Sequence, residues 1–595
     1  MPKVPLRVVA LLTLFTALAA NAQWAPGPTY SAPPHFDHII FIIQENRTPD
    51  TLFGGAPIGG NPPCAGFNGF ANGVDLQNGG PNKAVSSTCT PLASYPDLSF
   101  GGGSHSHGDF EDQYDAGALD GACVTGTGAN CTAVPYGPYI DVQQSVVAPY
   151  LSIASNYGWA NYFFQTNQGP SFPAHQFLFS GSSAPTWPGK SYSRYFVSEN
   201  PGFLTSGCGG TPAPGLNWID PTGLESSVTT LFPKPKGFLE KGYTCYDRNT
   251  LVTYSASNTS AVSDRLQSNG TPITWKYYSQ QAGIIWNAPE AITQTCNSQN
   301  AILPNAAGTA PAACGTNGTE YSHVSLPVAN VTGAPILTDI QNCKLQQISW
   351  VTPDGVWSDH PGSSFFNKTY PNLGPSWVAV LVNAIGQSAK NGCDYWNTEP
   401  TAIFILWDDW GGYYDHVPPP AVNVGTGTPP NKFKCTNSQG GAWGCGYTYG
   451  FRVPLLVVSP YTQPGIVSGA LSSNTLPTLA QYANLPHAWA HDFGSLLKFA
   501  EENFYPAGTR IAPTGYTYAD SNTFDTSYNG KTVVPMWEFF TSPTVVPFTA
   551  ITPGTNPVTG LPYDASFFEG YYTNADQVTG VEHKPIGADD DGDQD

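Results

Sequence analysis

Charged side chains are scarce in this sequence, and basic ones are the scarcest. Only 11% of the 595 residues are charged, and 22 Lys and Arg stand against 42 Asp and Glu, which gives a net charge of −20. A chain this acidic does not bind nucleic acid or an anionic membrane surface through its net charge. The same acidity leaves room for a cation held inside the protein.

Long apolar runs are also missing beyond the first 22 residues. No later uninterrupted apolar segment reaches about 20 residues, so we expect no transmembrane helix. The first 22 residues combine Lys3 and Arg7 with an apolar run over residues 8–20 and the small residues of Ala20-Asn21-Ala22. This pattern is typical of a secretory signal peptide. We therefore expect cleavage near Ala22 and a secreted or periplasmic mature protein.

No two cysteines have CxxC spacing, which argues against a cysteine-bound zinc ion. The chain nevertheless contains twelve cysteines, an even number, and an exported protein passes through an oxidising compartment. Disulfide bonds are therefore the default expectation. The sequence does not determine how the cysteines pair. Pairing of neighbours along the chain, such as Cys123–Cys131 and Cys435–Cys445, is our prediction.

Aromatic residues, glycine and proline are abundant instead. Aromatics reach 13%, with 63 Gly and 56 Pro, which indicates a loop-rich protein around a large core and not a disordered chain. Apolar segments with the composition of buried strands alternate with segments of helical pattern. This alternation predicts an α/β fold with a largely parallel sheet. The predicted strands cover residues 38–43, 157–164, 347–351, 402–407 and 452–460, and the predicted helices cover 138–154, 377–387 and 491–504.

Adjacent oxygen-bearing side chains follow two of the predicted buried strands. Asp408 and Asp409 come after one strand, and Glu45 and Asn46 come after another. Neighbouring side chains of a strand point to opposite faces, but a turn at Gly411-Gly412 would let both Asp residues face one target. The carboxyl ends of parallel strands meet at one sheet edge, so these residues predict a divalent-cation site. The alternative is an Asp-Gly turn and a helix cap with an ordinary surface acid.

Ser171 lies two residues before Pro173 in a segment that predicts the start of a helix. A hydroxyl at a helix N-terminus feels the positive end of the helix dipole, which stabilises an alkoxide and attracts a phosphate. Contact with a metal ion would lower the pKa of this hydroxyl further. Ser171 is therefore a candidate nucleophile. The alternative is that Ser171 only caps the helix.

Histidines in two predicted loops are candidates for binding or protonating a phosphate group. His105 and His107 lie one residue apart beside an acidic segment with helical pattern, and Asp359-His360 follow a predicted strand. An imidazole near a phosphate can act as a general acid or as an electrostatic clamp. Both patterns also occur in ordinary surface loops.

Seven segments in the same order resemble the bacterial phosphoesterase family that contains phospholipases C and respiratory-burst-type acid phosphatases, within the alkaline-phosphatase-like superfamily. They span residues 38–504 and read HIIFIIQENRTPDTLFG, the segment 105–120, GPSFPAHQFLFSG, ISWVTPDGVWSDHPG, TAIFILWDDWGGYYDHVPPP, GFRVPLLVVSPYT and HDFGSLLKFAEENF.

The resemblance implies a three-layer α/β/α fold with a mostly parallel central sheet and long disulfide-pinned loop insertions. A signal peptide at 1–22 would precede a catalytic domain at 23–545, with insertions around 55–104 and 182–335. A C-terminal extension at 546–595 would end in an acidic, disordered tail.

The resemblance also implies roles for single residues. One divalent metal cation, of unknown identity, would be bound by residues that match the family's ligands: Glu45, Asn46, Ser171, Asp408 and Asp409. Ser171 would be the nucleophile as well. His105, His360 and, by a looser alignment, His323 would lie near the phosphate. One departure stands out, because Ala174-His175 replaces the Asn-Arg that usually follows the nucleophile's proline.

We therefore expect a metal-dependent phosphoester hydrolase that acts on a small phosphoester or a phospholipid. We expect the chain to lack the paired C-terminal β-domains of the longer phospholipases, and this expectation favours acid-phosphatase-like or broad phosphomonoesterase activity. The first alternative is a phospholipase C-type phosphodiesterase that acts on phosphatidylcholine-like lipids. The second is an exported binding or surface protein whose acids hold a structural cation.

Overall fold

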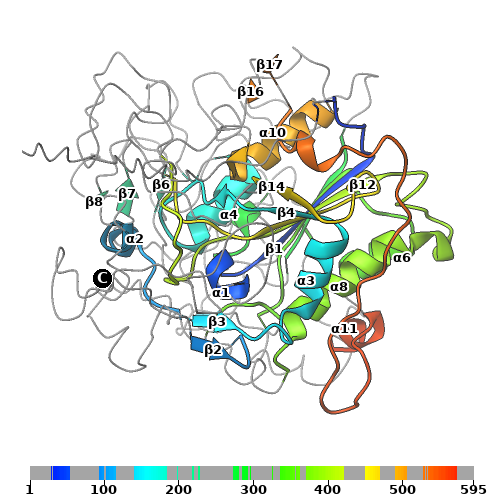
Figure 1. Ribbon diagram of the computed structural model, residues 1–595, viewed down its shortest axis with the longest axis horizontal. Coiled ribbons are helices and arrows are strands. Elements are labelled where there is room, and N and C mark those ends of the chain that lie inside the picture. The colour runs from blue at the N-terminus through cyan, green and yellow to red at the C-terminus, as the bar shows by residue number, and fades with distance from the viewer. Residues whose placement is uncertain are drawn as a thin grey trace, which may run out of the picture.

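The structure is a computed structural model of the full chain (Figure 1). It describes residues 31–53, 93–98, 102–114, 140–181, 273–279, 285–292, 335–355, 357–361, 370–420, 449–469, 489–504 and 534–571, together with a few isolated residues and short strands.

An eight-stranded sheet forms the centre of the described fold, in the order β10-β9-β11-β1-β12-β13-β4-β14. Seven of its strands run in one direction, and β13 alone runs antiparallel to both of its neighbours. The prediction of an α/β fold with a mostly parallel sheet is therefore confirmed. The strands span β1 His38–Gln44, β4 Gly158–Ala160, β9 Trp275–Tyr278, β10 Val324–Ser325, β11 Ile348–Val351, β12 Thr401–Trp407, β13 Leu455–Val458 and β14 Ile466–Ser468.

The two long central strands, β1 and β12, are buried along their whole length. Their Ile-, Phe- and Leu-rich sequences suit a strand covered on both faces, where no polar face is needed. They pair in parallel from His38 opposite Thr401 to Gln44 opposite Trp407, so both strands end at the same level. The residues that follow each strand therefore leave the sheet at the same edge.

Six of the described α-helices form two contact groups (Figure 1). Helix α8 (Leu373–Gly386) contacts α3 (Ala148–Asn156), α6 (Pro335–Gln341) and α11 (Ala565–Tyr571). Helix α4 (Ser171–Ser180) contacts α10 (Phe493–Phe504). Three-layer packing and the disulfide-pinned insertions remain predictions.

Smaller elements complete the described part of the chain. They are α1 Pro49–Phe53, α2 His107–Tyr114, β2 Ala93–Tyr95, β3 Ile140–Val142, β5 Phe163–Phe164, β6 Val197–Ser198, β7 Asn217–Ile219, β8 Glu225–Ser227, β15 His491–Asp492, β16 Ser527–Tyr528, β17 Lys531–Thr532 and the 3-10 helices η4 Ala288–Ala291, η7 Ser388–Asn391 and η10 Trp537–Phe539.

Two predicted elements differ from the structure. The helix predicted over 138–154 begins only at Ala148, because residues 140–142 form β3 and pair with β2. The strand predicted over 157–164 is split into β4 and β5, which belong to different sheets. In both segments the pairing partner is remote in sequence, so a local pattern could not reveal it.

Residues after the predicted domain boundary at 545 also pack on the core. Ile551 and Phe568 are buried in the main hydrophobic cluster, and α11 contacts α8. A disulfide joins Cys343 to Cys393, which are neighbours in the order of cysteines along the chain. The predicted pairs Cys123–Cys131 and Cys435–Cys445 lie outside the described residues. Within the described residues, no helix combines the length and the apolar composition that a membrane crossing needs.

Candidate active site

The acids that follow β1 and β12 lie side by side where the two strands end. The backbone N–H of Asn46 donates to Oδ1 of Asp408 over 3.0 Å, which joins the two strand ends directly. Glu45, Asn46, Asp408 and Asp409 are all fully buried. Asn46 adopts a positive φ of 50°, a conformation that Asn tolerates better than most residues. This turn redirects the chain just after Glu45.

The two glycines after the acids provide the turn that the sequence required. Gly411 and Gly412 both have positive φ, at 62° and 69°. A Cβ on Gly411 would lie 2.8 Å from the carbonyl oxygen of Asn46, and one on Gly412 would lie 2.6 Å from that of Gly103. The backbone N–H of Gly411 also donates to Oδ1 of Asp409 over 2.7 Å. The glycines thus let three chain segments approach closely around the acids.

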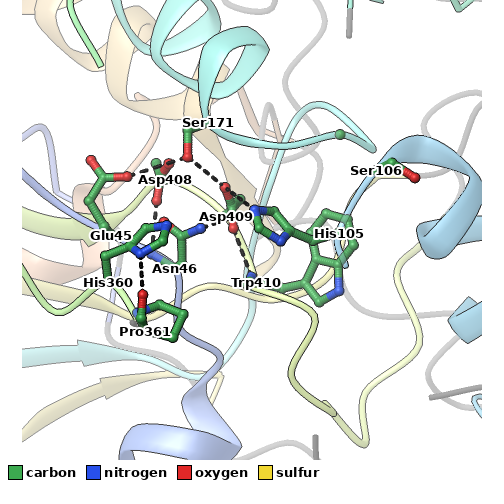
Figure 2. A network of polar contacts seen from close by, with 12 residues as sticks. Glu45, Asn46, His105, Ser106, Ser171, His360, Pro361, Asp408, Asp409 and Trp410 are labelled. Carbon is green, nitrogen blue, oxygen red and sulfur yellow. Dashed lines mark hydrogen bonds and ion pairs between the residues drawn. The ribbon is translucent and has the colours of Figure 1, made fainter. Parts of the chain in front are cut away.

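Ser171 lies at the first position of α4 and faces these acids (Figure 2). Its Oγ donates to Oδ2 of Asp409 at 3.0 Å and lies 3.4 Å from Oε2 of Glu45. The N-cap position belongs to Pro170, and no side chain caps the helix. The hydroxyl therefore points at carboxylates instead of capping its own helix, and the simple capping interpretation does not describe it.

His105 lies beside the same acids, on the loop that leads into α2. Its Nδ1 lies 2.8 Å from the carbonyl oxygen of Gly103, so Nδ1 donates a hydrogen bond to this oxygen. Nε2 lies 3.2 Å from Nδ2 of Asn46 and 3.9 Å from Oδ2 of Asp409. The Nε2 edge of the imidazole thus faces the acids of the site.

A reciprocal cap fixes the loop of His105. The backbone N–H of Asp109 donates to Oγ of Ser106, and the backbone N–H of Ser106 donates to Oδ2 of Asp109. This capping box starts α2 two residues after His105. From α2, Gln113 accepts a hydrogen bond from Nε1 of Trp410 over 3.0 Å, which holds the helix against the turn after β12.

His360 lies on the loop after β11. The preceding residue, Asp359, donates its backbone N–H to Oε1 of Gln44 over 3.1 Å, which ties this loop to the end of β1. Nδ1 of His360 donates a hydrogen bond to the carbonyl oxygen of Pro361 (Figure 2). Burial raises the pKa of Asp359 to about 7, against hydrogen bonds from Tyr150 and Trp407 and the charge of Arg47. His323 lies outside the described residues.

His175 is the residue of this site to which the sequence analysis assigned no role. It lies four residues after Ser171 in α4, so both side chains project from the same face of the helix. Its Nε2 is 2.9 Å from Oε1 of Glu45 and 3.6 Å from Oδ2 of Asp408. Burial lowers the pKa of His175 to about 4, against the charge of Asp408. The four-residue spacing from the predicted nucleophile was the signal that could have identified it.

The residues at this edge fit a divalent cation. Oδ2 of Asp408 and Oδ1 of Asn46 are buried and accept no hydrogen bond from the described residues. Such buried oxygens are costly unless a partner compensates them. Carboxylate, amide and hydroxyl oxygens are the donors that hard cations prefer. A cation held by these residues would supply the missing partner.

The fold and the site together define a class. The class is that of α/β proteins in which strand ends gather a serine hydroxyl and buried acids at one sheet edge.

The chain belongs to the Phosphoesterase family, whose family model matches residues 36–505. The predicted family is thereby confirmed, and the wider superfamily remains a prediction.

Several curated proteins are similar to parts of the chain. Phospholipase C B of Mycobacterium tuberculosis is 34% identical over 131 residues, which cover 21% of this chain and 22% of that protein. Non-hemolytic phospholipase C of Burkholderia pseudomallei is 30% identical over 141 residues, 23% of this chain and 18% of that protein. Non-specific phospholipase C6 of Arabidopsis thaliana is 29% identical over 133 residues, 22% of this chain and 21% of that protein. The chain thus spans about a fifth of the length of these relatives.

Proposed function

We propose that this protein is a secreted, metal-dependent phosphoester hydrolase with acid-phosphatase-like or broad phosphomonoesterase activity. The observation that carries the proposal is the contact of Ser171 Oγ with Asp409 and Glu45 inside a buried acidic site. Membership of the Phosphoesterase family supports phosphoric esters as the substrate class. A small phosphoester molecule is the substrate that we propose first.

One divalent cation would be held by Glu45, Asn46, Ser171, Asp408 and Asp409. When bound, it would lower the pKa of the Ser171 hydroxyl and balance negative charge on a phosphoryl oxygen.

The chain's own groups would perform the remaining steps. Oδ2 of Asp409 already accepts the hydrogen bond of Ser171 and is placed to take its proton as Oγ attacks phosphorus. Attack in line with the leaving ester oxygen forms a P–O bond to Ser171 as the bond to the leaving group breaks, and water then displaces Ser171 from phosphorus to release phosphate. His105 and His360, together with His323 if it lies near the phosphate, would stabilise the equatorial charge or protonate the leaving oxygen.

A phospholipase C-type phosphodiesterase is the second candidate, because the similar proteins carry that name. It would release diacylglycerol from phosphatidylcholine-like lipids. Rates on p-nitrophenyl phosphate and on phosphatidylcholine micelles separate the two candidates. Higher activity on the soluble monoester supports a phosphomonoesterase, and activity confined to the micelles supports the phosphodiesterase.

The test of the nucleophile is Ser171→Ala. We expect it to remove nearly all turnover of p-nitrophenyl phosphate, because no other group would form the bond to phosphorus. Ser180→Ala is the matched control, since Ser180 is also buried in α4 but its hydroxyl donates to the carbonyl oxygen of Gln176. Circular dichroism checks that both variants fold. Unchanged turnover in Ser171→Ala would refute the assignment of Ser171 as the nucleophile. If the wild-type protein binds metal but releases phosphate from no ester, the alternative of an exported binding protein is favoured.

Export and the overall architecture belong to the same proposal. A signal peptide that is cleaved near Ala22 would place the enzyme outside the cytoplasm, and N-terminal sequencing of protein from the culture medium tests this. We also propose the three-layer α/β/α arrangement, with a catalytic domain at 23–545, disulfide-pinned insertions around 55–104 and 182–335, and an extension at 546–595.

A further inference from the structure

His175 contacts the acidic site from the helix that carries the predicted nucleophile. Its Nε2 lies 2.9 Å from Oε1 of Glu45 and 3.6 Å from Oδ2 of Asp408, and all three side chains are fully buried. These three atoms lie within 4.8 Å of one another. Two atoms bound to one cation at about 2.1 Å lie roughly 3–4 Å apart, so the observed separations are those of ligands that share an ion.

A hydrogen bond from the imidazole accounts for only part of this arrangement. A single proton on Nε2 can be donated to Glu45 at 2.9 Å, and Oδ2 of Asp408 is then left without a hydrogen bond from the described residues. Nδ1 of His175 has no hydrogen-bond partner among the described residues either. If Nδ1 carries the proton instead, the lone pair of Nε2 faces both carboxylates. A cation here would provide a partner for Nε2 of His175, Oε1 of Glu45 and Oδ2 of Asp408.

A second buried cluster in the same structure provides a contrast. Asp50, Asp415 and His416 also bring three possible ligand atoms together. There, Arg452 donates from Nε to Asp415 over 2.8 Å and from Nη2 to Asp50 over 3.3 Å. The guanidinium already provides the positive charge between the two carboxylates. This cluster is a buried ion-pair network, and it carries no metal proposal.

We propose that Nε2 of His175 is a nitrogen ligand of the divalent cation, next to Glu45 and Asp408. The inference rests on the proposed function, because it concerns the same cation. An imidazole ligand favours borderline transition-metal ions such as Zn²⁺, Mn²⁺, Fe²⁺ or Co²⁺, whereas sites of oxygen ligands alone suit Ca²⁺ and Mg²⁺. The site therefore takes a transition-metal ion in preference to Ca²⁺ or Mg²⁺.

The direct test is pulsed electron paramagnetic resonance of the full-length protein, stripped with a chelator and reloaded with Mn²⁺. We expect the electron spin echo of the wild type to show modulation from a coordinated imidazole nitrogen. His175→Gln should lose this modulation. His105→Gln removes the imidazole that lies near Asp409 and should keep the modulation. The wild-type spectrum can overturn the inference even if a variant fails to fold. Bound Mn²⁺ without nitrogen modulation overturns the inference.

Metal selectivity provides a second readout that does not depend on activity. The stripped wild type is dialysed against equal concentrations of Zn²⁺, Mn²⁺, Ca²⁺ and Mg²⁺, and the bound metal is measured by mass spectrometry. We expect transition metal in at least about tenfold excess over Ca²⁺ and Mg²⁺, and a drop of about tenfold or more in that ratio for His175→Gln. Preferential binding of Ca²⁺ or Mg²⁺ by the wild type overturns the inference alone. If the wild type binds none of the four ions, the proposed metal-dependent function fails with it.

Discussion

Burial in this fold changes the pKa of the carboxyl group of Asp359. Asp359 is fully buried, and both Tyr150 Oη and Trp407 Nε1 donate to its Oδ2, at 2.8 and 3.1 Å. Its Oδ1 accepts no hydrogen bond from the described residues. A proton on Oδ1 therefore suits the site, in agreement with a pKa that burial raises to about 7.

The raised pKa of Asp359 predicts a pH dependence of stability. The folded state keeps this proton up to about pH 7, whereas the unfolded chain releases it near pH 3.8. The folded state thus binds more protons between these values, so the free energy of unfolding falls as pH rises from about 4 to 7, by up to about 4 kcal/mol. Asp359→Asn mimics the protonated acid and should remove this fall. Urea denaturation at a series of pH values measures it.

Asp394 offers a control of opposite sign. The Thr398 hydroxyl and the amide groups of Asn397 lower its pKa, so its contribution to stability is present above its unfolded pKa and is lost as pH falls. Asp394→Asn should therefore lose more stability at neutral than at acidic pH. Parallel pH curves for wild type and Asp359→Asn would contradict the prediction for Asp359.

At the scale of elements, the site depends on close contacts between backbone segments. Gly412 combines a positive φ with a direct approach to Gly103, whereas Gly560 has a φ of 70° and open space around the position of a Cβ. Gly560→Ala should cost only the backbone strain, about 1–2 kcal/mol. Gly412→Ala should cost roughly 1–3 kcal/mol more and reduce turnover, because the backbone around the acids must shift. Thermal unfolding and phosphatase assays compare the two, and equal losses would contradict the contact argument.

The buried network around Arg452 connects three elements. Its guanidinium binds Asp415 after β12, Asp50 in α1 and the carbonyl oxygen of Asn161 after β4. Arg452→Met leaves buried carboxylates without their partner and should cost about 3–5 kcal/mol. Lys276→Met, which breaks the partly exposed pair with Asp339, should cost about 1 kcal/mol or less. Chemical denaturation tests the difference, and similar losses would argue against a structural role for the network.

The elements that the sequence predicted best are those whose signal is local. The apolar runs of β1 and β12 and the helical pattern of α8 are visible in the local sequence, because burial on both faces gives a continuous apolar run and burial of one side of a helix gives a periodic pattern. The same holds for the oxygen-rich residues directly after these strands. The split of residues 157–164 into β4 and β5 depends on partners far along the chain. His175 stood out as a departure from the family pattern and lies four residues after Ser171, but its contact with Glu45 spans 130 residues and could not be predicted from these local signals.

At the scale of the whole molecule, a disulfide joins segments on either side of α8. The Cys343–Cys393 bond closes a loop of 50 residues, which restricts the unfolded chain. The double substitution Cys343→Ala and Cys393→Ala should lower the free energy of unfolding by about 4 kcal/mol. Equilibrium denaturation under oxidising conditions measures this, and a loss below about 1 kcal/mol would show that the bond constrains the unfolded state little.

The parallel pairing of β1 with β12 has a consequence for how this chain can change. The spacing between Glu45 and Asp408 is set by two adjacent strands that finish together, and not by the more than 300 residues between them. Loops in that interval can therefore grow or shrink without moving these two carboxylates apart. Gain or loss of one residue inside either strand would instead turn the following acids toward the opposite face.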